Sequence, residues 1–205
     1  MSKFLKNVSI SAGILIQAFT GMRESELLAL NENCVVIENK EDINNKINKI
    51  KGYTFKYETN NLIEEKTGRL VDWLCPEIVI RAIECLKIMN SNANYKFNKE
   101  VQKNNISNGI MTFQEGIDLL FIENYSGEIK NPKLKRVTKY YNDFINEHGI
   151  NLDFKLTSHC FRRTLARLFA KSILNLPVDI LKEQFKHFSK EITYYYLKED
   201  KNKLI

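Results

Sequence analysis

Apolar residues recur at helical spacing near the start of the chain and predict two consecutive helices. The first runs from Ser9 to Phe19, and Gly21 is well placed to end it. The second follows at once within residues 20–30, because acidic residues fill its first turn and leucines form its buried face. The inward positions of the first helix are Ile10, Ile14, Leu15 and Ala18.

Three segments rich in β-branched and aromatic residues then predict strands at 34–37, 53–57 and 70–74. The polar segment 38–49, rich in Asn and Lys, is expected to be a long solvated connection. Turn-forming residues within 58–69 indicate the loop of a hairpin. Together these segments predict a small three-stranded antiparallel sheet.

Helical periodicity returns after the predicted sheet. Pro76 is expected to start a helix that continues through Met89, since proline is well suited to a first helical turn. Residues 90–111 lack periodicity and are expected to form a surface loop. The inward positions of the helix are Ile78, Ala82, Leu86 and Met89, with Val79 and Ile83 beside them.

Three further helices are expected, from Asn131 to Gly149, from His159 to Leu174 and from Pro177 to about Phe185. The sequence contains no internal repeat, low-complexity tail or Gly/Ser linker, so residues 1–205 are expected to form one domain. The predicted class is α+β, mostly helical. In the first of these helices the inward positions are Leu134, Val137, Tyr140, Tyr141, Phe144 and Ile145.

Composition limits the location and the partners of the protein. A formal net charge of +6 on 205 residues favours a polyanionic partner without requiring one. The four cysteines form no C-x-x-C pair, so we expect reduced thiols, no zinc site and a cytoplasmic location. The apolar run 12–19 is too short to cross a membrane, and a signal-peptide cleavage site is missing from the start of the sequence.

Five cations fall within residues 130–139, with no acidic residue among them. Such a run can be the solvated face of a helix or a patch that contacts phosphates, and the sequence leaves both possibilities open. The five are Lys130, Lys133, Lys135, Arg136 and Lys139.

Three groups of polar residues are candidates for chemistry. Arg23 stands at a helix N-terminus, where the dipole disfavours a cation, so it needs an anion such as Glu26 or a ligand. His159 and Arg162 are three residues apart and therefore project from one helix face. A run of three tyrosines occupies 194–196.

These groups together resemble the catalytic domain of the tyrosine recombinases, or phage integrases, over the whole chain. Thr20-Gly21-Met22-Arg23 and the following helix resemble the first arginine box of that family. Ser158-His159 through Arg162-Arg163-Thr164 resembles its His-x-x-Arg box. In the terminal box, His187 is followed after six residues by Thr193 and after nine by Tyr196, which selects Tyr196 among the three tyrosines.

The resemblance implies that Tyr196 attacks a DNA phosphodiester and forms a 3′-phosphotyrosine, with no ATP, metal or other cofactor. Arg23 and Arg162 would hold the phosphate oxygens, because a guanidinium is always charged and binds through a planar fork. His159 and His187 would donate hydrogen bonds to the same oxygens. His159 could also accept the phenolic proton.

The resemblance further implies a supporting role for Glu26 and a hairpin lysine that protonates the departing 5′ oxygen. Lys56, in Thr54-Phe55-Lys56, resembles the T-x-K form of this lysine and is preferred because it lies on a predicted strand. Lys66, in Lys66-Thr67-Gly68, resembles the K-T-G form and is the alternative.

Some features differ from the family pattern. Lys186 stands where the family usually has glycine before the terminal-box histidine, which concerns the helix cap rather than the chemistry. The N-terminal domain that completes a clamp around DNA in the family has no counterpart in residues 1–205. The resemblance implies double-stranded DNA as the partner, with four subunits acting on two DNA sites in the full-length protein.

Site-specific recombination of the integrase or transposase type is therefore the expected function. Two alternatives share the same motifs. One is DNA relaxation of the type IB topoisomerase kind, which uses the same chemistry without a partner site. The other is a DNA-binding relic of the recombinase fold that has no catalytic activity.

Overall fold

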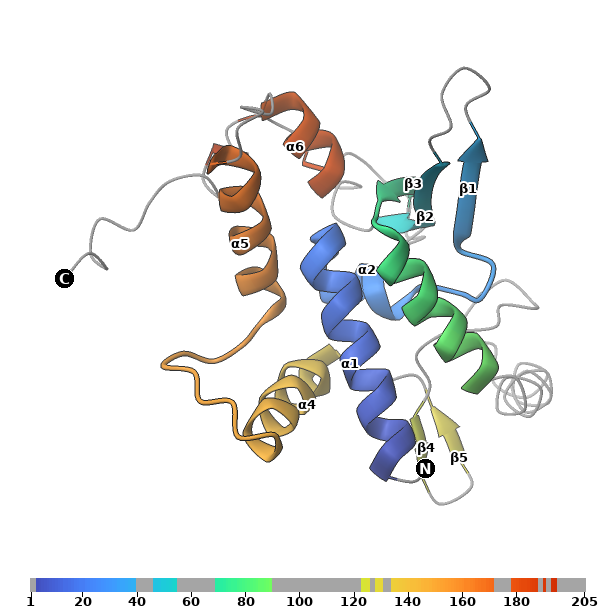
Figure 1. Ribbon diagram of the computed structural model, residues 1–205, viewed down its shortest axis with the longest axis vertical. Coiled ribbons are helices and arrows are strands. Elements are labelled where there is room, and N and C mark those ends of the chain that lie inside the picture. The colour runs from blue at the N-terminus through green and yellow to red at the C-terminus, as the bar shows by residue number, and fades with distance from the viewer. Residues whose placement is uncertain are drawn as a thin grey trace, which may run out of the picture.

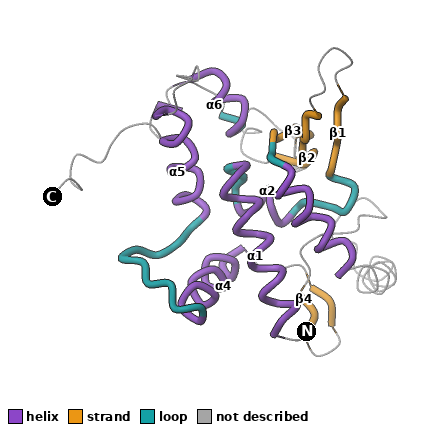
Figure 2. The backbone as a smooth tube through the Cα atoms, viewed as in Figure 1, coloured by secondary structure: helices purple, strands orange, loops and turns teal. Residues whose placement is uncertain are grey.

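The structure is a computed structural model that describes residues 3–39, 46–54, 69–89, 123–125, 128–130, 134–171, 178–187, 190 and 193–194. For 39, 123–125, 128–130, 134–136 and 170–171 it describes the backbone alone. Helices predominate, and a small three-stranded sheet lies at one side of them (Figures 1 and 2). The architecture is mostly helical with a three-stranded antiparallel sheet, which confirms the predicted class.

The first helix, α1 (Lys3–Thr20), begins six residues before the predicted Ser9 and ends where Gly21 was expected to stop it. Gly21 has a positive φ of 68°, a conformation that glycine adopts without steric cost. The Thr20 hydroxyl donates to the Ile16 carbonyl at 2.6 Å and accepts from the Met22 amide at 3.2 Å. These bonds make the sharp turn into α2 (Glu24–Leu28), the second predicted helix.

The sheet consists of β1 (Val35–Asn39), β2 (Lys46–Thr54) and β3 (Arg69–Leu74), in that order and antiparallel throughout. Its register places Ile50 of β2 opposite Val35 on one side and opposite Trp73 on the other. The predicted strands at 34–37 and 70–74 correspond to β1 and β3, whereas the strand predicted at 53–57 overlaps β2 only at Tyr53 and Thr54, and its residues 55–57 lie outside the described residues.

The expectation of a solvated connection over 38–49 was wrong at both of its ends. Strand β1 extends to Asn39 and β2 already begins at Lys46, so the two strands take up half of that segment. The residues Ile50, Gly52 and Thr54 are buried, whereas Lys51 is exposed, which is the alternation expected of a strand with one buried face. Lys46 and Lys49 of that segment lie on β2, and Lys49 forms a 2.6 Å ion pair with Glu38 of β1.

The helix at 77–89 follows Pro76 and confirms the predicted helix. One inward position was wrong, because the side chain of Ile78 is 45% exposed while Val79 is fully buried. The buried stripe is rotated by one residue and consists of Val79, Ile80, Ala82, Ile83 and Leu86. The predicted surface loop at 90–111 lies outside the described residues.

The last three helices also match their predictions: α4 (Leu134–Glu147), α5 (Ser158–Lys171) and α6 (Val178–Phe185). Val137, Tyr141 and Ile145 of α4 are buried, as the helical spacing predicts, and Gly149 ends the helix with a φ of 69°. A two-stranded sheet that the sequence did not indicate, β4 (Glu123–Tyr125) with β5 (Glu128–Lys130), precedes α4.

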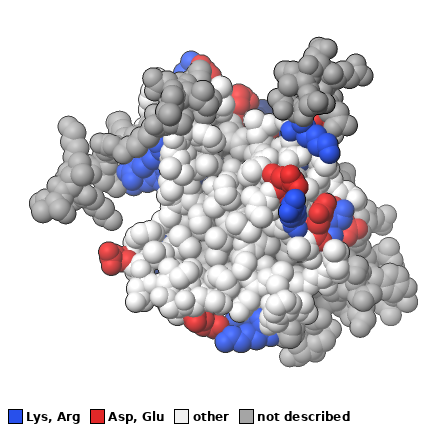
Figure 3. Space-filling model, viewed as in Figure 1, with Lys and Arg blue, Asp and Glu red and all other residues white. Residues whose placement is uncertain are grey.

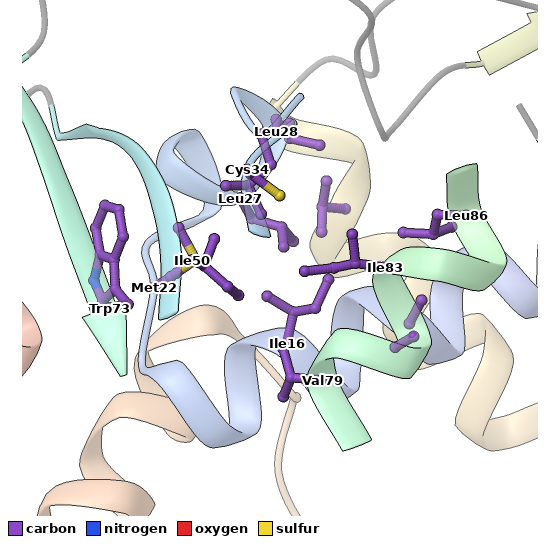
Figure 4. Packing of buried hydrophobic residues seen from close by; sticks show 14 of the residues in the cluster. Ile16, Met22, Leu27, Leu28, Cys34, Ile50, Trp73, Val79, Ile83 and Leu86 are labelled. Carbon is purple, nitrogen blue, oxygen red and sulfur yellow. The ribbon is translucent and has the colours of Figure 1, made fainter. Parts of the chain in front are cut away.

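Two hydrophobic clusters hold the described elements together. The larger one surrounds α1, which runs between α5 and the helix 77–89 (Figure 1), and it includes Ile16, Ile50 and Ile83 (Figure 4). The smaller one joins α5 to α6 through Leu165, Ala166, Leu181 and Phe185. The turn at Gly21 touches both clusters, since Met22 belongs to the first and Gly21 contacts Phe185 of the second.

All four cysteines are free thiols, and none of the described helices is long and apolar enough to span a membrane. Burial raises the pKa of Cys34 to about 12 and that of Cys75 to about 11, because a thiolate is poorly solvated there. Cys85 is exposed on the helix 77–89.

We expect the thiols to differ in reactivity toward iodoacetamide at pH 8. Roughly one Cys34 thiol in ten thousand is ionised at that pH, so alkylation of the folded chain should modify Cys85 long before Cys34 or Cys75. Peptide mass spectrometry over a time course measures this order. If Cys34, Cys75 and Cys85 were alkylated at equal rates in the folded chain, and at those same rates in urea, the buried positions of Cys34 and Cys75 would be contradicted.

Candidate active site

Glu26 is fully buried at the start of α2 and binds both the backbone and the side chain of Arg23. Its Oε2 accepts from the Arg23 amide at 2.6 Å, and its Oε1 accepts from Arg23 Nη1 at 2.6 Å. Arg23 thus has the anion that its place at a helix N-terminus requires. The second terminal nitrogen, Arg23 Nη2, is buried without a hydrogen-bond partner among the described residues.

Glu26 also connects α2 to two distant parts of the chain. The Thr54 hydroxyl, at the end of β2, donates to Glu26 Oε1 at 2.7 Å. From α5, the Arg162 Nη1 atom lies 4.0 Å from Glu26 Oε2. One carboxylate therefore gathers the guanidinium groups of Arg23 and Arg162 on the side of the molecule where β2 ends.

Arg162 is 1% exposed, and main-chain oxygens hold its guanidinium. Its Nη1 donates to the Gly21 carbonyl, and its Nη2 donates to the Phe185 carbonyl at 2.8 Å. The ring of Phe185 lies under the guanidinium, 4.7 Å from its centre. Because these partners come from the turn after α1 and from the end of α6, the position of the charge depends on both segments.

His187 follows the end of α6, and the helix cap places it beside Arg162. Its amide donates to the Lys182 carbonyl at 3.0 Å, and the Lys186 amide donates to Glu183 at 3.3 Å, which together form a Schellman cap. Lys186 takes the left-handed conformation of this cap, with φ 54°. The cap that glycine usually makes in the family thus forms here with lysine.

The Lys186 side chain folds over the sheet. Its Nζ lies 5.5 Å from the centre of the Trp73 ring, and the side chain is half-buried. Burial lowers the pKa of Lys186, with Glu183 and Asp72 opposing the shift. A cation therefore sits between the end of α6 and the strand β3.

The side chain of His187 is buried and completes a chain of contacts. Its Nε2 lies 2.9 Å from Arg162 Nη2, and its Nδ1 lies 3.0 Å from the Thr193 hydroxyl. The structure thus brings Arg23 and Glu26 together with Arg162 and His187, which come from a distant part of the sequence.

The other residues singled out from the sequence are placed less completely. His159 occupies the first turn of α5, one turn before Arg162, with its side chain exposed. Tyr196, Lys56 and Lys66 lie outside the described residues.

The basic run at 130–139 is described only in part. Lys139 is exposed on α4, whereas the side chains of the other four, Lys130, Lys133, Lys135 and Arg136, lie outside the described residues. On the face shown in Figure 3, the visible described Lys and Arg side chains are scattered toward the edges and mostly lie beside acidic ones. That face of the described part is mostly uncharged at its centre.

Two buried glutamines that the sequence did not single out hold the segments of the site in place. Gln184 of α6 donates to the carbonyls of Thr20 at 3.1 Å and Leu74 at 3.0 Å, and accepts from the Leu74 amide at 3.1 Å. Gln17 of α1 donates to the Met22 carbonyl at 3.1 Å and to the Ser158 hydroxyl at 2.9 Å. In the sequence each of them is a single polar residue on an otherwise apolar helix face, and this pattern is only a weak indication of a buried hydrogen-bonding role.

Comparison with solved structures identifies the fold. The chain is similar to the XerH site-specific recombinase bound to its difH substrate in a pre-cleavage complex, with a TM-score of 0.57 and 18% identity over 97% of this chain and 45% of that one. It is similar to the XerA recombinase with a TM-score of 0.53 and 16% identity, over 98% of this chain and 59% of that one.

A third similar structure is the Tn1549 transposon integrase in complex with transposon right end DNA, with a TM-score of 0.55 and 14% identity over 97% of this chain and 61% of that one. The chain thus has the fold of a tyrosine recombinase catalytic domain, and it spans about half the length of these solved chains. No protein-family model and no curated protein sequence matches it.

Gly21 offers a stability test with a matched control. A Cβ at Gly21 would lie 2.8 Å from Cδ1 of the Phe185 ring and closer still to Cε1, whereas a Cβ at Gly149 meets nothing within 4 Å, and both residues have nearly the same positive φ. Gly149→Ala should therefore cost only the left-handed backbone penalty of about 1 kcal/mol. Gly21→Ala should cost about 3 kcal/mol, because the buried ring beneath Arg162 must also move.

Urea unfolding of the two variants measures both costs. The difference between them isolates the contact with Phe185, since the backbone terms cancel. Equal losses of unfolding free energy would mean that the turn at Gly21 does not press against α6.

Proposed function

We propose that this chain catalyses site-specific DNA recombination by strand cleavage and rejoining, with Tyr196 as the nucleophile and a 3′-phosphotyrosine as the intermediate. The assignment joins the fold, the three sequence boxes and the contacts around Glu26. Double-stranded DNA is the proposed substrate.

The observation that carries the proposal is the meeting of two arginines from separate boxes on one buried carboxylate. Glu26 holds Arg23 at 2.6 Å and lies 4.0 Å from Arg162, so two cations are fixed near each other before any ligand arrives. Such preorganised donors stabilise charge that develops in a transition state, because they need no reorganisation when it forms. The Nη2 atom of Arg23 is buried and has no hydrogen-bond partner among the described residues, and it is the kind of donor that a phosphate oxygen would take up.

The proposed reaction is a phosphoryl transfer in two reversible steps. The Tyr196 oxygen attacks phosphorus, its proton passes to a base for which His159 is the candidate, and the bond from phosphorus to the 5′ oxygen breaks. A lysine gives the 5′ oxygen its proton. The 5′-hydroxyl of a partner strand then attacks the phosphotyrosine and releases Tyr196, so the number of phosphodiester bonds is conserved.

The contacts of Thr54 support Lys56 as the lysine of this step. Thr54 touches Glu26, and Lys56 is two residues further on, so its Cα lies within roughly 7 Å of the Thr54 Cα. Lys66 precedes β3 by three residues, and Arg69 at the start of β3 pairs with Thr54. Lys56 follows Thr54 by two residues and Lys66 precedes Arg69 by three, and the shorter separation favours Lys56.

The proposed partners follow from the same comparison. Two of the similar structures are complexes with DNA, a difH substrate and a transposon end, which supports DNA as the ligand of this fold. Because the chain spans about half the length of those proteins, we propose that assembly of four subunits on two sites belongs to a longer form of the protein.

Substitution of Tyr196 tests the proposal directly. Incubation with a labelled library of nicked duplexes should give a covalent protein–DNA adduct on a denaturing gel, and Tyr196→Phe should abolish it while retention in a native gel is unchanged. Peptide mapping of the adduct should identify Tyr196. Adduct formation by the Tyr196→Phe variant would reject the assignment. If the wild type bound DNA but formed no adduct, a DNA-binding relic without catalytic activity would be favoured. Relaxation of supercoiled plasmids of any sequence would favour a topoisomerase.

The two lysines can be separated with a substrate whose leaving group needs no proton. Lys56→Ala should slow cleavage of an ordinary duplex by about a hundredfold, the scale of general acid catalysis. The same variant should cleave a duplex with sulfur in place of the bridging 5′ oxygen nearly as fast as wild type, because a thiolate leaves unprotonated. Lys66→Ala is the matched control and should change neither rate. If instead Lys66→Ala slowed cleavage of the ordinary duplex and the sulfur substrate restored its rate, while Lys56→Ala had no effect, Lys66 would be the general acid.

A further inference from the structure

Both ring nitrogens of His187 contact protein side chains. Nε2 lies 2.9 Å from Arg162 Nη2, and Nδ1 lies 3.0 Å from the Thr193 hydroxyl. The ring is buried and stands edge-on to Phe185, with ring centres 5.5 Å apart. Its orientation is therefore fixed on three sides.

The chemistry of these partners determines which nitrogen carries the proton. A guanidinium has donors only, so Nε2 must accept from Arg162. A neutral imidazole has one N–H, which must then be on Nδ1 and must point at the Thr193 oxygen. An imidazolium would set one N–H against another and bring two positive charges together at 2.9 Å.

We propose that Thr193 is a positioning residue, whose hydroxyl holds His187 in the Nδ1–H tautomer so that the histidine orients the Arg162 guanidinium. Its importance for cleavage rests on the proposed function, whereas the tautomer is a property of the folded chain. In this arrangement Nε2 of His187 accepts from Arg162, so the histidine acts on the site through that guanidinium, in place of the direct hydrogen bond to a phosphate oxygen that the family resemblance implies.

Burial makes this contact hard to replace. Thr193 is fully buried, so water cannot readily take the place of its hydroxyl. Without the hydroxyl, the proton loses its acceptor at Nδ1, and the other tautomer would set Nε2–H against the donor of Arg162. Arg162 Nη2 would then keep its hydrogen bond to the Phe185 carbonyl but lose its acceptor on the imidazole, and the guanidinium plane could rotate.

The position of Thr193 in the chain adds a second consequence. Thr193 stands three residues before Tyr196, so the hydroxyl that orients Arg162 belongs to the same segment of sequence as the proposed nucleophile. Docking of Thr193 on His187 therefore couples the arginine site to that segment.

Nitrogen-15 NMR of the imidazole rings tests the tautomer in the full 205-residue chain. The chain has three histidines, and His148 supplies an internal reference, because its Nδ1 donates to the Phe144 carbonyl at 2.8 Å. We expect the wild-type His187 ring to show the Nδ1–H pattern, assigned by its disappearance in His187→Gln. An Nε2–H or doubly protonated ring at neutral pH in the wild type would overturn the proposal, whatever the variants do.

Substitutions at Thr193 test the positioning role. Thr193→Val keeps the shape and removes the hydroxyl, and it should slow single-turnover cleavage roughly tenfold, the factor that a hydrogen bond of ordinary strength represents. Thr193→Ser restores the hydroxyl and should recover most of the rate. Tyr194→Phe is the matched control, since it removes an exposed hydroxyl from the next residue and should leave the rate unchanged.

The readouts separate positioning from folding and from the proposed function. DNA affinity should stay within twofold in Thr193→Val, while the His187 signals shift and the His148 signals do not. Equal rates in the Val and Ser variants, or unshifted His187 signals in a folded Val variant, would sink the inference even if the wild type cleaves DNA. A wild type that never cleaves would sink the proposed function, and the NMR result would still decide the tautomer.

Discussion

A buried guanidinium governs the arrangement of the described segments. A charge taken out of water is tolerated only when it is compensated, and the two terminal nitrogens of Arg162 meet the carbonyls of Gly21 and Phe185 and the ring of His187, with the carboxylate of Glu26 4.0 Å away. These partners come from the turn after α1, the end of α6 and the start of α2. In this fold the burial of Arg162 therefore depends on the meeting of those segments, and moving one of them leaves a donor uncompensated.

Apolar packing alone would not fix these segments so closely, since it is divided between two hydrophobic clusters that meet around the turn at Gly21. Directional bonds from buried glutamines supply the missing precision. Gln184 binds the end of α1 and the end of β3 at once, which locks α6 to both. Gln17 ties the residue before Arg23 to the first residue of α5. The hydrogen bonds of these two glutamines thus hold the segments of the two hydrophobic clusters in the relative positions that the site requires.

Sequence reasoning was most reliable where one face of an element repeats. Periodicity found α1, the helix 77–89, α4, α5 and α6, because each buries a stripe of apolar residues. It failed at the start of β2, where Lys and Asn alternate with few apolar residues and the pairing with β1, including Lys49 to Glu38, supplies the stabilisation. The boxes indicated which residue types the site contains, but no local pattern reveals that Glu26 serves two arginines or that Gln184 joins three elements, because those contacts depend on tertiary packing.

Lys186 shows how the site overrides local preference. A left-handed backbone costs a lysine about 1 kcal/mol, and glycine would avoid that cost. The cap is nevertheless required, because the bond from the His187 amide to Lys182 turns the chain so that the imidazole meets Arg162. The contact of the Lys186 ammonium with the Trp73 ring offsets part of that cost, and the burial that comes with this contact lowers the pKa of Lys186. The polar contacts of His187 on one side and the sheet on the other therefore keep Lys186 in a backbone conformation that is unfavourable for lysine. The geometry around His187 is set by the helix cap, whichever residue forms it.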